Sequence, residues 1–88
     1  MPKGTDPQPD AFEDALMQVI RARMAMRNMN IADLSRAIGI PRPTVSRIIN
    51  GKRAASLNQV RLMAIATETP MSSLMRAADN LLAGKDPF

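Results

Sequence analysis

The chain has 88 residues, 45% of them apolar, with a formal net charge of +4 and neither cysteine nor histidine. This length predicts one small domain, and the absent residue types exclude disulfides, a Ser-His or Cys-His nucleophile and an ordinary zinc site. No apolar run approaches the ~20 residues that cross a bilayer and no signal peptide is visible near Met1, so we expect a cytoplasmic protein without enzymatic activity, cofactor or membrane partner.

The N-terminal segment differs from the rest of the chain. Residues 1–9, MPKGTDPQP, contain three of the seven prolines and no apolar periodicity, which predicts a flexible arm. We expect one domain over residues 10–83 and a short tail over residues 84–88.

A first helix is predicted directly after the arm. Asp10 and Glu13 form a capping-box pattern, because each side chain can accept a hydrogen bond from an amide left free in the first turn. Apolar residues then recur at helical spacing up to about Arg27: Phe12, Leu16, Val19, Ile20 and Met24. We expect the arginines on this helix, Arg21, Arg23 and Arg27, to form a solubilising surface.

Two short helices separated by a glycine are predicted next. Asn30 is a favourable N-cap for a helix over residues 32–38, which Gly39 ends. A third helix is expected over residues 42–50, closed by Asn50-Gly51. The expected inward-facing side chains are Leu34, Ala37, Ile38, Val45 and Ile48, with Ile49 either in the core or against a partner.

Two further helices complete a predicted all-α domain of five helices. Ser56 and Gln59 form a second capping-box pattern that opens a fourth helix ending near Thr67. Thr69-Pro70 is the expected start of the fifth, since proline is tolerated in the first turn. The expected apolar sides are Leu57, Val60, Met63 and Ala64 in the fourth helix, and Met71, Leu74, Met75, Ala78, Leu81 and Leu82 in the fifth.

The excess positive charge lies in one segment. Residues 1–29 hold four basic and four acidic residues, and residues 54–88 hold three of each. Between residues 30 and 53 a single acid, Asp33, is outnumbered by five basic residues: Arg36, Arg42, Arg47, Lys52 and Arg53. This distribution predicts a local positive field that attracts a polyanion.

The basic segment coincides with a motif. Two short helices around a glycine turn, the second edged with arginine, can place that second helix in the major groove of DNA. The segment NIADLSRAIGIPRPTVSRIINGKR, residues 30–53, resembles the lambda-repressor-like, or XRE, helix-turn-helix family of phage repressors, Cro proteins and bacterial regulators. The resemblance covers about 46 residues, from Asn30 to Met75, without a gap. The matching positions are Asn30, Leu34, Gly39, Val45 and Asn50-Gly51-Lys52.

The resemblance implies two sets of DNA contacts. Base edges would be read in the major groove by Arg42, Pro43, Ser46 and Arg47. An arginine fork that binds O6 and N7 of guanine together discriminates between bases by ~1–3 kcal/mol. Phosphate contacts, which position the protein without reading sequence, would come from Asn30, Arg36, Thr44, Asn50, Lys52 and Arg53.

The chain departs from the family pattern at three places. Pro41 and Pro43 flank Arg42, which puts Arg42 at or before the start of its helix. Thr67-Glu68-Thr69 stands where the family commonly has Leu-Gly-Val, so we expect a different geometry at the junction of the fourth and fifth helices. Ile49 stands where a polar residue is usual.

We expect sequence-specific binding of double-stranded DNA and repression of transcription, as by a Cro-type protein, a short immunity repressor or a DNA-binding fragment. Leu81 and Leu82 lie beyond the resemblance and either pack within the monomer or form the contact of a homodimer, which we favour because two motifs read a palindromic operator.

Two alternatives stay open. An antitoxin would use the same motif to repress its own operon and a second surface to neutralise a toxin protein. A helical interaction module or RNA-associated protein is less favoured, because single-strand RNA readers stack bases on exposed aromatics and this chain has only Phe12 and Phe88.

Overall fold

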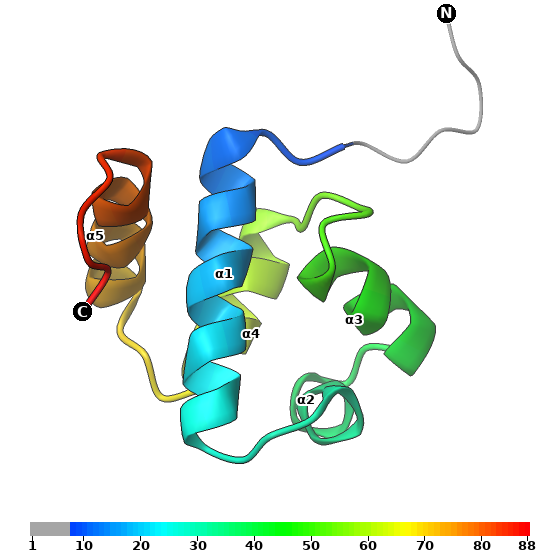
Figure 1. Cartoon of the computed structure of the whole chain (residues 1–88). Coiled ribbons are helices and arrows are strands. Elements are labelled where there is room, and N and C mark those ends of the chain that lie inside the picture. Colours follow the sequence, from blue (N-terminus) through cyan, green and yellow to red (C-terminus); the bar gives the residue numbers. More distant parts are fainter. Residues whose placement is uncertain (1–7) are drawn as a thin grey trace, which may run out of the picture.

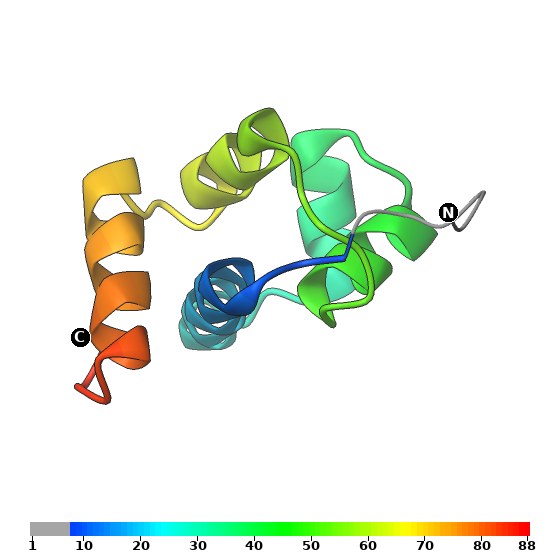
Figure 2. The ribbon, with the colours of Figure 1, turned by 90° about the horizontal axis from the view of Figure 1, so that it is seen from above.

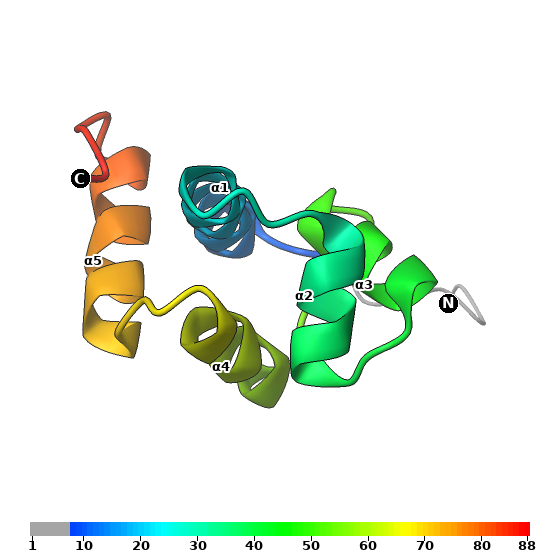
Figure 3. The same ribbon diagram turned by 90° about the horizontal axis from the view of Figure 1, so that it is seen from below.

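The structure is a computed structural model that describes residues 8–88, so the arm predicted over residues 1–9 lies almost entirely outside the described residues. Within them the chain forms five helices and no strand, as predicted: α1 (Ala11–Met26), α2 (Ile31–Ile38), α3 (Arg42–Ile49), α4 (Leu57–Ala66) and α5 (Met71–Leu82) (Figure 1). Figures 2 and 3 show α5 at one end of the molecule and α2 with α3 at the other, with α1 and α4 between them. None of the described helices is both long and apolar enough to span a bilayer.

Three of the five helices begin with a reciprocal capping box. In each box, the N-cap side chain accepts from the amide three residues on, and the side chain there accepts from the N-cap amide. The two predicted boxes, Asp10 with Glu13 and Ser56 with Gln59, are present. Asn30 is the N-cap of α2, as expected, and forms a third box with Asp33.

The largest side chain without exposed surface in each helix lies in the core. These residues are Ile20, Leu34, Ile48, Met63 and Leu74. They belong to one hydrophobic cluster in which α1 supplies the most buried residues, so α1 is the central helix of the domain. Ile49 is also buried, which places it in the core.

Two residues expected in the core lie at the surface. Leu57 is 74% exposed because it is the first residue of α4, and a helical side chain leans toward the N-terminus, where no element covers it. Ala37 is exposed because α2 packs on α3 and α4 through Leu34, and Ala37 falls outside this contact. Periodicity identified the correct side of each helix, but not how far its neighbours cover that side.

The junction between α4 and α5 contains a residue in the left-handed conformation, although no glycine is present there. Glu68 adopts φ +54°, a conformation that costs a non-glycine residue roughly 1–2 kcal/mol. Thr67 and Thr69 on either side are buried, and the Thr67 hydroxyl donates to the carbonyl oxygen of Met63 at 2.8 Å. The turn is therefore held by its buried threonines rather than by a residue suited to its backbone.

Candidate nucleic-acid interface

The predicted pair of short helices around a glycine turn is present. α2 ends at Gly39, whose φ of +71° lies in the left-handed region that glycine adopts without strain. The Ser35 hydroxyl donates to the carbonyl oxygen of Ile40 at 2.5 Å and ties the turn to α2. Pro41 then precedes α3, which packs directly against α2 (Figure 3).

α3 has one buried and one exposed side. Val45, Ile48 and Ile49 face the core. The side chains expected to read bases lie elsewhere on the helix: Arg42, Pro43 and Arg47 are exposed and Ser46 is half-buried. Arg42 is the first residue of α3, which agrees with the start expected from its flanking prolines.

The six residues expected to contact phosphates are all exposed or half-buried: Asn30, Arg36, Thr44, Asn50, Lys52 and Arg53. Several of them also interact within the domain, among them Asn30 and Asn50. The Asn30 side-chain oxygen accepts from the Asp33 amide at 2.8 Å, and the Asn50 side-chain nitrogen donates to the carbonyl oxygen of Ser46 at 2.9 Å. Both residues therefore hold helix ends in addition to any role toward a ligand.

Arg36 forms an ion pair with Asp33, three residues earlier on α2. Its side chain is nevertheless 72% exposed. Exposed pairs of this kind contribute only about 0–1 kcal/mol, because water and salt screen them. Arg36 could therefore exchange the Asp33 carboxylate for a DNA phosphate at little cost in free energy.

Arg21 is a structural residue of this surface that sequence reasoning missed. Its Nη1 atom donates to the carbonyl oxygen of Ile49 at 2.6 Å, so α1 holds the C-terminal end of α3. Arg21 also lines a shallow hollow of about 340 Å³ together with Asn30 and Asn50. The contact joins residues 28 apart in the chain, so no local sequence pattern predicts it.

Arg23 of α1 and Arg27, the residue that caps the C-terminal end of α1, also hold distant elements. Arg23 Nε donates to the Thr69 hydroxyl at 3.0 Å, and Arg27 forms an ion pair with Glu68. The expectation that Arg21, Arg23 and Arg27 form a solubilising surface is therefore incomplete, since Arg21 and Arg27 are exposed but all three also make contacts within the domain. The charged groups of Arg23 and Arg27 secure the turn between α4 and α5, while their stems remain partly in solvent.

Replacing Arg21 with alanine is expected to lower the free energy of unfolding by about 1 kcal/mol, since a charged hydrogen bond at a helix C-terminus is lost. Hydrogen exchange should accelerate at the last amides of α3 more than at those of α5. Arg61→Ala, at an exposed position of α4, is the matched control. Uniform acceleration in both helices would contradict a local role for Arg21.

Comparison with families of known proteins matches the helix-turn-helix family over residues 20–74, more than half of the chain. The chain belongs to the lambda-repressor-like, or XRE, helix-turn-helix family, which confirms the resemblance of residues 30–53. It is accordingly a DNA-binding transcription regulator of the XRE type. Neither curated proteins nor solved structures provide a match to the chain.

Proposed function

We propose that this regulator is a cytoplasmic repressor that binds a palindromic operator as a homodimer, like a Cro-type protein or short immunity repressor of a phage or prophage. α2 and α3 form the helix-turn-helix in this proposal, with α3 in the major groove and α2 across the backbone. The division of α3 into a buried apolar side and an exposed arginine side carries the proposal, because Arg42 and Arg47 lie at the surface and outside the core.

Base reading is assigned to Arg42, Pro43, Ser46 and Arg47. The N-terminal residues of a recognition helix contact base edges, and Arg42 is the first residue of α3. Arg47 follows about one and a half turns later on an exposed position. The two guanidinium groups can therefore address different base pairs of one half-site.

Phosphate binding is assigned to residues of α2 and its N-cap, of the first turn of α3 and of the segment that follows α3. Asn30 opens α2, whose free amides and positive dipole end attract anions, and Arg36 lies on the exposed side of that helix. Thr44 lies in the first turn of α3, while Asn50, Lys52 and Arg53 follow its end. These contacts would place α3 in the groove without selecting a sequence.

Replacing Lys52 with alanine is expected to weaken binding to every duplex by a similar factor, because a phosphate contact carries no base information. The slope of log K against log salt should become less steep by about one unit, since one fewer counterion is released. Affinities measured between 50 and 200 mM salt would test this, with Lys85→Ala as a control outside the segment. An unchanged slope would remove Lys52 from the phosphate contacts.

The homodimer is assigned to the C-terminal part of α5. Leu82 is 52% exposed, whereas Leu81 is half-buried and packs against the core, so Leu82 is the better candidate for a contact with a second copy. Two copies related by a two-fold axis would engage half-sites about 34 Å apart, one turn of DNA.

Replacing Leu82 with aspartate is expected to yield monomers, because each copy would bury an unpaired carboxylate in an apolar contact. Light scattering at micromolar concentration measures the change. Leu57→Asp is the matched control, since Leu57 is also an exposed leucine but lies on α4. A dimer that survives in Leu82→Asp would place the interface elsewhere.

Selection of bound fragments from a random duplex library tests the proposed function most directly. A palindromic consensus would support the dimer and report the half-site separation, whereas recovery of random sequences would contradict sequence-specific binding. The antitoxin alternative keeps the same DNA surface and adds a toxin, so co-purification with a small protein encoded by a neighbouring reading frame would favour it.

A further inference from the structure

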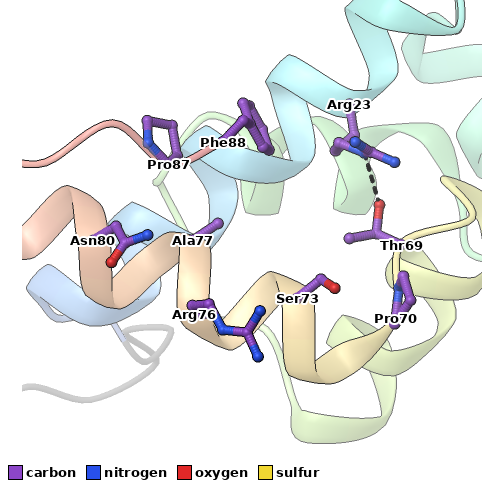
Figure 4. Close-up of a pocket in the computed structure, with 9 residues that line it drawn as sticks. All are labelled: Arg23, Thr69, Pro70, Ser73, Arg76, Ala77, Asn80, Pro87 and Phe88. Carbon is purple, nitrogen blue, oxygen red and sulfur yellow. Dashed lines mark hydrogen bonds between the residues drawn. The ribbon is translucent and has the colours of Figure 1, made fainter.

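A groove lies at the end of the molecule that carries α5. Its volume is about 390 Å³, and it is bordered by α5, the turn before α5, Pro87-Phe88 and Arg23 of α1 (Figure 4). α1 and α4 separate α5 from α2 and α3 (Figure 2). A ligand in this groove would therefore not compete for the surface to which DNA binding is assigned.

The groove is also separate from the proposed dimer contact. Ser73, Arg76, Ala77 and Asn80 line it and recur at the spacing of one helical face. Leu82 follows Arg76 by six residues, which places it on a different side of α5. Leu82 itself therefore does not belong to this row of side chains.

The walls combine two guanidinium groups with apolar surface. Arg23 is held in place, because its Nε atom donates to the Thr69 hydroxyl at 3.0 Å and its guanidinium carbon lies 5.8 Å from the centre of the Phe88 ring. Figure 4 shows Arg23 and Arg76 on opposite borders of the groove, with Ala77 and Ser73 between them. Apolar contact surface comes from Pro70, Ala77, Pro87 and Phe88, the last of which is 61% exposed.

No acidic side chain among the described residues lines the groove. Within residues 8–88, the Arg76 side chain forms no hydrogen bond or ion pair, and the nearby acid Glu68 is paired with Arg27 outside the groove. The two arginines outnumber the one carboxylate group that the lining residues carry, the α-carboxylate of Phe88. The remaining positive charge is complementary to the carboxylates of a ligand, which a guanidinium can bind through two parallel hydrogen bonds.

We propose that this groove binds an acidic segment of a partner protein, with Arg23 and Arg76 holding carboxylates and Phe88 packing on an apolar side chain between them. The open shape favours a peptide segment over a small molecule, because small-molecule sites enclose most of their ligand. The apolar lining favours a peptide over a phosphate backbone, whose contacts are mainly polar and charged. The proposal is independent of the proposed repressor function, since it needs no DNA.

A random library of 12-residue peptides displayed on phage, selected against the full chain, tests the proposal. Peptides that bind the basic surface of α2 and α3 must be removed first, and depletion on the Arg76→Glu chain does this because that surface is unaltered. We expect the surviving peptides to carry at least two acidic residues around an apolar residue. A selection that yields no such peptides would overturn the proposal.

A selected peptide can then be mapped onto the chain. We expect its addition to shift the amide resonances of Thr69, Ser73 and Ala77 in preference to those of α3. Arg76→Gln should weaken its binding at least about tenfold, the effect of losing one charged hydrogen-bonding partner. Arg61→Gln on α4 is the matched control and should leave the affinity unchanged.

Three results would overturn the proposal. The first is equal affinity of the peptide for the parent chain and for Arg76→Gln. The second is equal affinity for a peptide whose acids are replaced by their amides. The third is dissociation of a dimer of the parent chain when the peptide is added, measured by light scattering, which would assign the groove to a second copy. Operator binding by Arg76→Gln, measured in parallel, should be unchanged and reports separately on the repressor function.

Discussion

Replacing Ile48 with alanine is expected to lower the free energy of unfolding by about 2–5 kcal/mol. Ile48 has no exposed surface and belongs to the cluster that joins all five helices, so truncation leaves a cavity that its neighbours fill only in part. Domains of this kind have only about 5–15 kcal/mol of stability. The substitution would therefore remove a large share of the folded population and, with it, DNA binding.

Urea denaturation followed by circular dichroism measures this loss. Ile65→Ala is the matched control, because Ile65 is an isoleucine of α4 that is 57% exposed. The control should change the free energy of unfolding by less than about 0.5 kcal/mol. Equal denaturation midpoints for the two variants would show that Ile48 does not anchor α3 in the core.

Replacing Arg47 with alanine is expected to weaken binding to the selected operator by about 1–3 kcal/mol and to relax the preference at one base position in each half-site. The physical reason is that a guanidinium can satisfy two acceptors on one guanine, and alanine offers neither donor. The fold should persist, because the Arg47 side chain is exposed rather than part of the core.

Affinities for the operator and for a scrambled duplex of the same length test this prediction. The operator should lose more affinity than the scrambled duplex, so the ratio between them should fall. Arg61→Ala removes the same charge from α4 and should leave the ratio intact. A loss of equal size on both duplexes would reassign Arg47 from base reading to phosphate contact.

The helices themselves could be predicted from local sequence signals. The capping boxes at Asp10 and Ser56 and the glycine at position 39 act within a few residues, and each fixes a helix end where it was expected. Periodicity likewise identified Val45 and Ile48 as core residues. Helix caps and apolar periodicity depend on residues that are close in the chain, so they can be recognised in a single sequence.

What could not be predicted depends on residues far apart in the chain. Leu57 matches the apolar pattern of α4, yet burial requires a covering element that the pattern does not specify. Arg21 reaches a carbonyl group 28 residues away and Arg23 a hydroxyl group 46 residues away. The loss of glycine at position 68 was expected to change the junction, but the buried threonines on both sides hold Glu68 in the left-handed conformation.

The candidate site was predicted in part. The resemblance identified the family and the exposed arginines of α3, while the division into base-reading and phosphate-binding residues stays a prediction. The groove beside α5 had no counterpart in the sequence patterns, because its walls come from α1, α5 and the last residues of the chain.

Arg21 and Arg23 are two residues apart on α1. Arg21 donates to the carbonyl oxygen of Ile49 at the end of α3, and Arg23 donates to the hydroxyl of Thr69, which lines the groove beside α5. α1 therefore braces both ends of the molecule from neighbouring positions on one helix, so a substitution that displaces α1 would loosen α3 and the turn before α5 together.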